Sequence, residues 1–440
     1  MCMDPAPPPP PRLTRRGVLA GAAALAGTTT ALAAAGMPNA SATTAGPTDR
    51  QDAGGDGPVG ADLVIEGGTL LDPATGEVTE NAVVVIAAGT VRAAGTRDAT
   101  RAERAGLPDG TPVLDAHGRW VLPGLIDAHI HLNTVGEARD ALRYGATGVR
   151  SGSTDFYQDI AVREIARRVP GQAPATRAAG IFVTPDLADT LLADPELAPL
   201  AGLRDGVRSP EALRRVVRVN LRRGADVVKT RANPRAGLPE QDPLEQAYDR
   251  EQLSTVVAAA RRGGAGVLCH AYSESGCHDA VMAGVRSLEH GVYVGERTLH
   301  EMRGRGTYFT PTLTPIASLA DSDDPVLAER GRRYLPVLKQ AVRTAHELGV
   351  PLAAGTDSSG GTVTPVGHEV ALLHAAGLSA LDALRTATTG AAELLGRKGE
   401  AGRLARGYAG DAVLLDGDPL KDPAVLKRPV RVVRSGVRVS

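Results

Sequence analysis

The feature that most constrains the fold of this chain is a repeated pattern of helix, glycine stop and apolar strand within residues 122–397. In one unit, Ser209 and Pro210 form a typical helix start, apolar residues follow at helical spacing, and Gly224 precedes the strand-like segment 225–229. The same unit recurs twice further along the chain, over residues 249–269 and 324–355. Strands that alternate with helices in this way indicate parallel βα units.

About 275 residues of such units match the size of a (β/α)8 barrel, for which about 250 residues is typical. Short alternating strand patterns occur on both sides of this region, and neither side has enough apolar surface to fold alone. We therefore expect an α/β protein: a (β/α)8 TIM-like barrel over residues 122–400, with a small β-sandwich domain built from both chain ends, 61–121 and 401–440.

The amino-terminal segment has the pattern of an export signal rather than of a folded domain. Arg15 and Arg16 precede an uncharged, alanine-rich run that ends near Ala35, which resembles a twin-arginine signal. The run is short for a membrane span, which needs about 20 strongly apolar residues, and small-residue cleavage sites flank it. We expect residues 1–36 to be a removed signal of an exported protein and 37–60 a flexible linker, with an uncleaved anchor as the alternative.

The composition excludes several classes of binding protein. A formal charge of −1 argues against a nucleic-acid or anionic-membrane partner. Aromatic residues make up only 3% of the chain, which is unlike a surface that stacks on bases or sugars. Three cysteines without CxxC spacing provide neither a disulfide scaffold nor a zinc finger. The expected partner is a small molecule, and any metal would be held by histidines and carboxylates. Whether the chain forms a homo-oligomer stays open.

Histidines close the first apolar strand of the predicted barrel. The segment 121–131 ends in His129-Ile130-His131, and side chains two residues apart point to the same face of a strand. The active site of such a barrel lies at the carboxyl ends of its strands. A lone histidine is most often a core residue, whereas this pair favours a metal site.

Lys229 ends another strand, Val227-Val228-Lys229, in a chain whose 49 Lys and Arg residues include only five lysines. A buried amine can deprotonate and react with carbon dioxide to give a carbamate that bridges two metals. The alternative is a lysine that neutralises neighbouring carboxylates.

Three further strand ends carry polar residues of the same kind. His270 follows Val267-Leu268-Cys269, His290 follows residues 285–289, and Asp357 closes the strand that begins at Pro351. Neutral imidazoles are typical ligands of catalytic zinc, and a carboxylate can both ligate metal and accept a proton from bound water.

Together these motifs resemble the metal-dependent amidohydrolase superfamily, in particular its imidazolonepropionase-like branch, which includes Xaa-Pro dipeptidases (prolidases). The resemblance covers roughly residues 61–440. It implies two divalent metal ions, expected to be zinc. It also implies roles for the strand-end residues: His129, His131 and Asp357 hold one metal, carboxylated Lys229 bridges, and His270 and His290 hold the second metal.

The resulting hypothesis is an exported hydrolase that cleaves an amide C–N bond in a small substrate such as a dipeptide or N-acyl amino acid, with Asp357 as the catalytic proton acceptor. Arg231 and Tyr272 are candidates for binding a substrate carboxylate. A one-metal deaminase or cyclic amidohydrolase is the enzyme alternative. The non-enzyme alternative is a secreted ligand-binding barrel without turnover.

The remaining candidates have simpler interpretations. His117 lies at a turn and is expected to be structural, and Cys269 points away from the site because it neighbours His270 on the strand. The pair His368-Glu369 follows a glycine-rich loop, and both a structural role and a role over the site stay open for it.

Overall fold

The structure is a computed structural model that describes residues 60–439. The predicted export signal, residues 1–36, and all but the last residue of the predicted linker, residues 37–60, lie outside the described residues.

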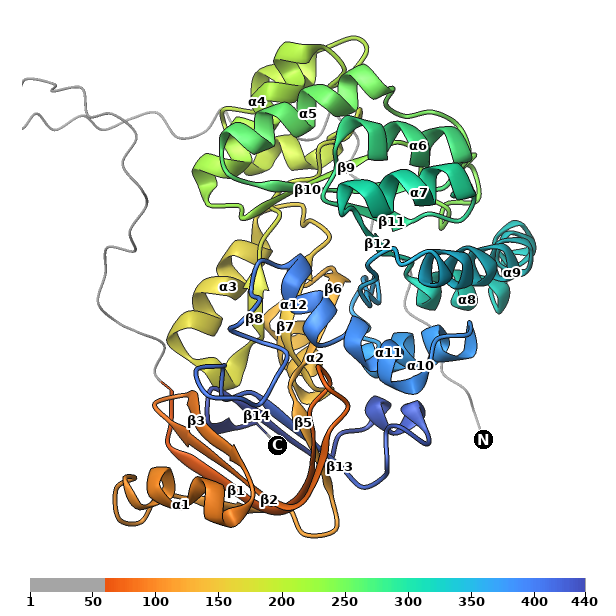
Figure 1. The fold of residues 1–440 in the computed structure, drawn as a ribbon. Coiled ribbons are helices and arrows are strands. Elements are labelled where there is room, and N and C mark those ends of the chain that lie inside the picture. Colours follow the sequence, from red (N-terminus) through yellow and green to blue (C-terminus); the bar gives the residue numbers. More distant parts are fainter. Residues whose placement is uncertain (1–59, 440) are drawn as a thin grey trace, which may run out of the picture. The chain divides into compact units, whose positions relative to one another are not determined.

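Strands from both ends of the described chain form one mixed sheet (Figure 1). Their order is β15-β14-β13-β5-β1-β2-β3, with β4 also paired to β1. Their bounds are β1 (Leu63–Leu71), β2 (Val78–Ala87), β3 (Thr90–Gly95), β4 (Val113–Asp115), β5 (Trp120–Pro123), β13 (Ala412–Leu415), β14 (Arg431–Arg434) and β15 (Val437–Arg438). Val413 in β13 lies opposite Leu122 in β5, so the end of the chain pairs with the strand that leads into the parallel region.

The two chain ends share an apolar core in this sheet. Leu63 and Ile65 from β1 are buried in one cluster with Leu414 from β13 and Val433 from β14. Because each end supplies only part of the cluster, the sheet depends on both. The domain boundaries expected from the sequence stay a prediction.

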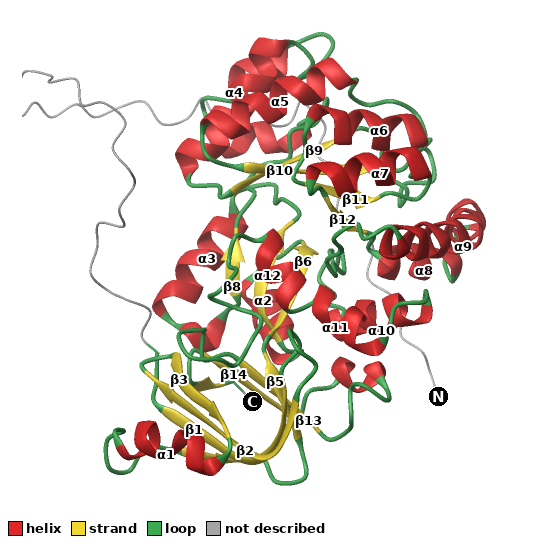
Figure 2. Cartoon of the chain, in the orientation of Figure 1, coloured by secondary structure: helices red, strands yellow, loops and turns green. Residues whose placement is uncertain are grey.

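Between the two ends, parallel strands alternate with helices (Figure 2). One parallel sheet has the order β6-β7-β8 and the other β12-β11-β10-β9. These strands are β6 (Leu125–Ile130), β7 (Ala146–Ser151), β8 (Ala175–Arg177), β9 (Val227–Arg231), β10 (Gly266–Ala271), β11 (Ser287–His290) and β12 (Tyr308–Thr310).

Half of the α-helices in the described residues lie between these strands, and most of the others follow β12. Their bounds are α1 (Arg97–Ala105), α2 (Val135–Arg143), α3 (Gln158–Arg168), α4 (Pro210–Arg223), α5 (Arg250–Arg262), α6 (Glu274–Ala283), α7 (Glu296–Arg305), α8 (Leu313–Ala320), α9 (Pro325–Glu347), α10 (Val366–Ala375), α11 (Ala380–Thr386) and α12 (Thr389–Leu394). Short 3-10 helices span Pro170–Gln172, Ala188–Ala193, Ala198–Gly202 and Pro423–Lys427.

The parallel strands of the described residues form two separate ladders, so a single closed eight-stranded ladder is not resolved. The predicted strand 351–357 makes a single bridge, Leu352 with Phe309, instead of a ladder. Its backbone nevertheless bonds to both neighbours: Ala353 N–H donates to Phe309 O, and Asp357 N–H donates to His129 O. Residues 351–357 are therefore an extended segment between β12 and β6, and the last of them, Asp357, is held beside His129.

Helix boundaries follow the capping chemistry of the sequence. The Ser209 side chain accepts from Ala212 N–H at the start of α4, and Gly224 ends that helix with φ of 104°. Asp249 and Gln252 form a reciprocal capping box at the start of α5. The helix start at Ser209 and the glycine stop at Gly224 are thus confirmed.

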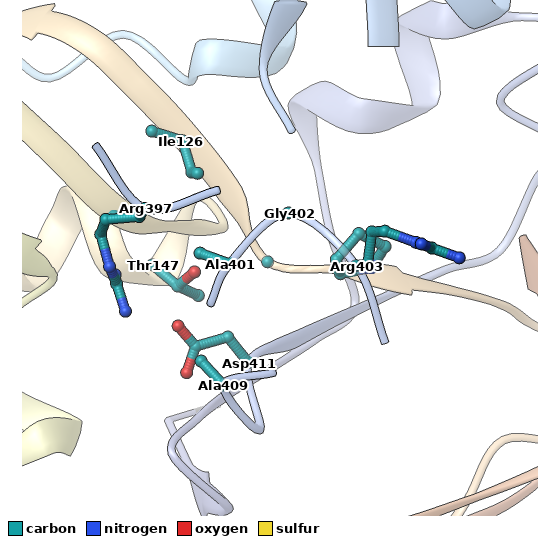
Figure 3. A pocket seen from close by; sticks show the side chains of 11 residues that line it. Ile126, Thr147, Arg397, Ala401, Gly402, Arg403, Ala409 and Asp411 are labelled. Atoms are coloured by element: carbon teal, nitrogen blue, oxygen red, sulfur yellow. The ribbon is translucent and has the colours of Figure 1, made fainter. Parts of the chain in front are cut away.

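A small cavity lies beside the start of β6, against Gly124 and Thr147 (Figure 3). Its three charged lining residues are already paired: Arg397 with Glu400 at 3.6 Å, Arg403 with Asp72, and Asp411 with Arg434 at 3.1 Å. It lies at the amino-terminal start of β6, whereas the polar residues lie at the carboxyl ends of the strands. Among the helices of residues 60–439, none is long and apolar enough to cross a membrane.

Candidate metal centre

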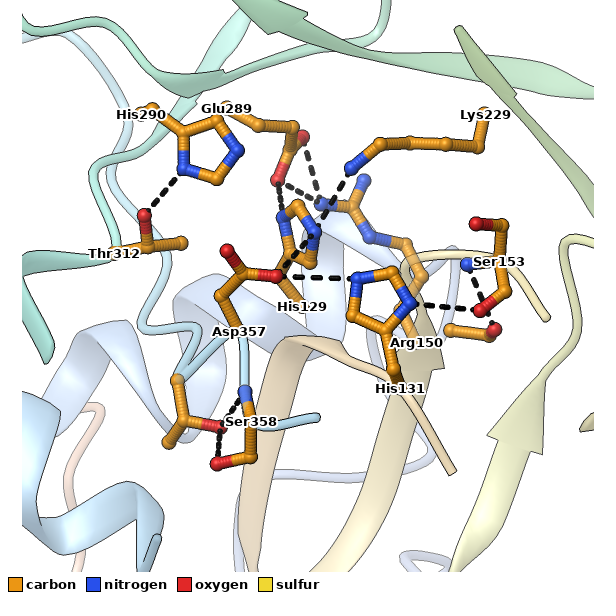
Figure 4. A network of polar contacts seen from close by, with 12 residues as sticks. His129, His131, Arg150, Ser153, Lys229, Glu289, His290, Thr312, Asp357 and Ser358 are labelled. Carbon is orange, nitrogen blue, oxygen red and sulfur yellow. Dashed lines mark hydrogen bonds and ion pairs between the residues drawn. The ribbon is translucent and has the colours of Figure 1, made fainter. Parts of the chain in front are cut away.

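His129, His131 and Asp357 come together at the carboxyl end of β6 (Figure 4). One potential ligand atom from each residue lies within 4.8 Å of the others. Asp357 Oδ1 is 3.1 Å from His131 Nε2 and 3.4 Å from His129 Nε2. Two imidazole nitrogens that face one carboxylate oxygen form a donor set suited to a divalent transition metal.

The other predicted site residues lie around this trio. Lys229 Nζ is 2.8 Å from His129 Nε2, so the lysine approaches the same nitrogen as Asp357. The ring centroid of His290 is 5.3 Å from that of His129 and 4.4 Å from that of His270. The four histidines, Lys229 and Asp357 thus converge from separate strands and one loop, although the compact three-residue set does not include His270, His290 or Lys229.

Each histidine has one ring nitrogen engaged by the protein. The partners are Glu289 Oε2 for His129 Nδ1 at 2.7 Å, Ser153 O for His131 Nδ1 at 2.8 Å, Pro234 O for His270 Nε2 at 2.9 Å, and Thr312 Oγ1 for His290 Nδ1 at 2.6 Å. A metal-binding histidine usually has its second nitrogen fixed by such a partner, which sets its tautomer and orientation. The second nitrogens of His129 and His131 contact the Lys229 amine and the Asp357 carboxylate, which are themselves candidate ligands. Each of the four rings can therefore offer its second nitrogen to a metal.

Gly152 leaves space at the centre of the site. A Cβ atom at this position would lie 2.6 Å from His131 Nε2 and 2.7 Å from His129 Nε2. A glycine here keeps the region in front of the two nitrogens open. The residues present therefore fit a metal ion by donor chemistry, by ring orientation and by space.

The sequence analysis missed the buried ion pair that supports His129. Arg150 in β7 donates to Glu289 in β11 at 3.0 Å and to Ser287 Oγ at 2.7 Å, and both charged side chains are almost completely buried. Glu289 in turn accepts from His129. A signal was available, because Ser287 and Glu289 occupy alternate positions of a strand and so face the same side.

Burial governs the charges of the candidate ligands. It lowers the pKa of His129 to about 4, with a further contribution from the Lys229 charge, and it lowers the pKa of His290 to about 3. Burial also lowers the pKa of Lys229 to about 8. Burial opposes ionisation of Asp357, but the charge of His129 and the hydrogen bond from His131 hold its pKa well below the usual range. Neutral imidazoles and an ionised carboxylate are the forms that bind metal.

Two site residues have left-handed backbone conformations: His290 with φ of 70° and Asp357 with φ of 50°. This region is uncommon for residues other than glycine and often occurs at functional sites. Next to Asp357, the Thr356 N–H and hydroxyl both donate to the buried carboxylate of Asp127. The turn that presents Asp357 is thus held to the strand that presents His129 and His131.

The two candidate substrate residues differ in placement. Tyr272 is buried, stacks on His290 with ring centroids 5.1 Å apart, and meets His270 edge-on. Arg231 lies further out, where its guanidinium donates to Thr184 Oγ1 and covers the Phe182 ring at 5.1 Å. Tyr272 therefore packs against the candidate ligands, whereas Arg231 lines their surroundings.

The structure also answers the question about His368-Glu369. Glu369 is buried in α10 and accepts from Leu313 N–H and from Thr314 N–H and Oγ1 at the start of α8. It therefore has a structural role, capping the helix that follows Thr312, the partner of His290. Cys269 is fully buried, and burial raises its thiol pKa to about 12, as suits a packing residue.

Comparisons with known proteins agree with this chemistry. The sequence profile of the amidohydrolase family matches residues 120–439. Ochratoxinase of Aspergillus niger is 30% identical over 235 residues, which cover 52% of this chain and 48% of that protein, so the match spans about half the relative's length.

Solved structures align over most of the described chain. A putative prolidase from Bifidobacterium longum has a TM-score of 0.73 at 27% identity, covering 87% of this chain and 95% of that one. A Xaa-Pro dipeptidase with bound methionine has a TM-score of 0.74 at 23% identity, covering 86% and 99%. This likeness gives the fold, an α/β barrel with a β-sandwich, and it confirms the resemblance to the prolidase-containing branch.

Proposed function

The chain belongs to the amidohydrolase family, and we propose that it is a hydrolase with two divalent metal ions that cleaves the amide bond of a small substrate. The observation that carries this proposal is that four histidines, each with one nitrogen fixed by a protein partner, gather around Lys229 and Asp357. A complete barrel, closed through segment 351–357, is part of the proposal.

In this proposal the ligands divide into two groups around a shared lysine. His129, His131 and Asp357 would hold the first metal, and His270 and His290 the second. Lys229, as a carbamate formed with carbon dioxide, would bridge them, because an anionic oxygen donor between two cations offsets their repulsion. Its position 2.8 Å from His129 Nε2 and its lowered pKa support this role.

A divalent metal in such a site supplies Lewis acidity toward a carbonyl oxygen and lowers the pKa of water. Asp357 is ionised and lies at the centre of the site, so its carboxylate can accept the proton of the attacking water and return it to the leaving amine nitrogen. The Glu289 carboxylate keeps the His129 ring oriented throughout, and the Arg150 guanidinium balances its charge.

The substrate class is supported by the relatives and by the surroundings of the site. Among the similar proteins are an ochratoxinase, a prolidase complexed with N-methylphosphonate-L-proline and a Xaa-Pro dipeptidase. We propose a dipeptide or N-acyl amino acid as substrate, with Arg231 as the group that binds its carboxylate. Tyr272 would support the ligand rings and line the same side of the site.

A one-metal enzyme, such as a deaminase or cyclic amidohydrolase, is the alternative. It is favoured by one observation: His129, His131 and Asp357 alone already form a compact set. Lys229 distinguishes the two, because a single metal requires no bridging carbamate.

We also propose that the protein is exported through the twin-arginine pathway, on the basis of Arg15, Arg16 and the apolar run that follows. Replacing both arginines by lysine should retain the protein in the cytoplasm. A chain that begins at Gly60 and is expressed separately should be as active as the processed protein. Export of the double lysine variant at the normal rate would refute this pathway.

The proposed activity is tested with a panel of dipeptides and N-acyl amino acids, assayed with zinc, manganese or cobalt. Hydrolysis should depend on added metal and should be absent from a His131→Ala variant under the same conditions. Compounds whose free carboxylate is amidated should be hydrolysed more slowly than their parent compounds, because Arg231 would have no anionic partner. Equal activity of metal-stripped and metal-loaded enzyme would contradict the proposal.

A further inference from the structure

The connection between β9 and α5, residues 232–249, contains neither helix nor strand. Connections of this length in compact domains are usually functional. This loop follows Arg231 directly, and its Pro234 carbonyl accepts the hydrogen bond from His270 Nε2 at 2.9 Å. One of the candidate ligands is therefore oriented by an irregular segment rather than by a strand.

A single side chain outside the loop bonds to three of its carbonyl groups. Arg330 in α9 donates to the backbone oxygens of Ala236, of Leu238 at 3.0 Å and of Gln241 at 2.9 Å. In the described part of the chain, all hydrogen bonds of this guanidinium go to the loop. The planar guanidinium has five N–H donors in fixed directions, which suits several carbonyls at once better than an ammonium group does.

The loop and α9 also meet the site through aromatic residues. Tyr334, one helical turn after Arg330, packs against Tyr272 with ring centroids 6.3 Å apart. On the other side of the loop, the Arg235 guanidinium lies 5.8 Å from the centroid of Phe182, whose ring is 5.6 Å from Lys229 Nζ. A shift of the loop would therefore reach both His270 and the surroundings of Lys229.

We propose that Arg330 is a positioning residue of this enzyme. It holds loop 232–249 in the conformation in which Pro234 orients His270 and Arg235 covers Phe182. Its hydrogen bonds go to the loop and not to the candidate ligands. The effect on metal and turnover rests on the proposed function, whereas the effect on the loop does not.

Trypsin can report the state of the loop in the full chain. Arg235 is the only lysine or arginine within residues 232–249, and it is exposed. In Arg330→Ala, cleavage after Arg235 should be at least about tenfold faster than in wild type, since each hydrogen bond to a charged group shifts a local opening equilibrium by about that factor. Arg332→Ala is the matched control, because Arg332 lies on the same helix and its one ion pair with a described residue is with Glu329 at the surface.

Metal binding and kinetics give the second measurement. Arg330→Ala should bind one of its two metals about tenfold more weakly, as loss of an outer-shell partner typically does, and should lose kcat more than it raises KM. Added methylguanidinium should slow cleavage after Arg235 and partly restore metal binding. The same additive should leave Arg332→Ala unchanged.

Arg330→Lys keeps the charge and most of the side-chain length, so it gives the answer if the alanine variant fails to fold. Its cleavage rate should lie between those of wild type and Arg330→Ala, because one ammonium group cannot match the guanidinium geometry. The proposal is overturned if the Arg330 variants that fold are cleaved after Arg235 no faster than Arg332→Ala. It is also overturned if cleavage becomes faster while the metal affinity stays that of wild type. Faster cleavage in a protein whose wild type binds no metal would refute the proposed function alone.

Discussion

At the scale of single residues, Lys229 and Asp357 approach the same nitrogen of His129, one with a basic amine and the other with an acidic carboxylate. The amine lies 2.8 Å and the carboxylate 3.4 Å from His129 Nε2. In the proposed function the first becomes a bridging carbamate and the second moves the proton. Substitutions at these two positions should therefore fail in different ways.

Asp357→Asn should retain appreciable metal, because the amide oxygen can still ligate, while kcat falls by about 10² or more through loss of the proton acceptor. Lys229→Ala should lose metal and activity together. Lys229→Arg should also fail, because a guanidinium stays protonated and forms no carbamate.

Metal analysis and rates on the three variants test this difference. A short carboxylic acid added with metal should partly rescue Lys229→Ala and leave Asp357→Asn unchanged. Full metal occupancy with near-normal turnover in Lys229→Ala would favour the one-metal alternative.

The lowered pKa of Lys229 gives a pH dependence for assembly of the site. Only the neutral amine reacts with carbon dioxide, and burial lowers the pKa of Lys229 from 10.5 to about 8. At constant dissolved carbon dioxide, activation of the metal-free protein by metal should rise about tenfold per pH unit below pH 8 and level off above it. An activation rate that is independent of carbon dioxide, or that keeps rising to pH 10, would contradict this assignment.

Gly152→Ala tests the space in front of the histidines. The added methyl would lie 2.6 Å from His131 Nε2 and 2.7 Å from His129 Nε2, so metal binding should fall by at least about tenfold. Gly202→Ala is a suitable control, since its Cβ would meet no atom within 4 Å. Isothermal titration with zinc measures both variants, and equal affinities would show that the metal lies elsewhere.

At the scale of elements, the site depends on how helix and strand ends are fixed. Thr312, which bonds His290, immediately precedes α8, and Glu369 from α10 caps that helix through three hydrogen bonds. An element that supplies no candidate ligand thus determines where one of them lies.

Glu369→Ala should destabilise the protein by about 2–3 kcal/mol, because it leaves buried N–H donors without an acceptor. It should also weaken metal binding through the displaced Thr312. His368→Ala, the neighbouring substitution, should change neither quantity much. Denaturant unfolding and zinc titration of the two variants provide the comparison. If Glu369→Ala is destabilised but keeps its metal affinity, the helix cap does not position the metal ligands.

The sequence predicted elements well where capping and periodicity coincide, as in α4 and α5. It did not predict α1, in which only Thr100 is buried, because a helix without an apolar face has no periodic signal. The strand expected at 351–357 was only partly correct, since its hydrogen bonds are split between Phe309 and His129. The strand-end histidines were visible in sequence, whereas the Pro234, Ser153 and Thr312 partners come from loops that no local pattern places.

At the scale of the whole molecule, residues far apart in the chain depend on each other. β13 near the carboxyl end pairs with β5, and β5 leads within two residues into β6, which presents His129. The Arg150–Glu289 pair then joins β7 to β11 beneath the candidate centre. The sequence indicated the helices and strands of the chain. Contacts between residues far apart in the sequence depend on tertiary packing, so only the structure shows which side chains support each candidate ligand.

In the proposed function, two metals held by these residues activate water for amide hydrolysis. The test is to titrate the metal-free protein with zinc in the presence of bicarbonate and to measure hydrolysis of the best substrate in the panel at each step. The proposed site predicts that activity appears mainly with the second equivalent of zinc per chain, and that Lys229→Ala shows no such rise. Full activity at one equivalent, or none at any loading, would contradict it.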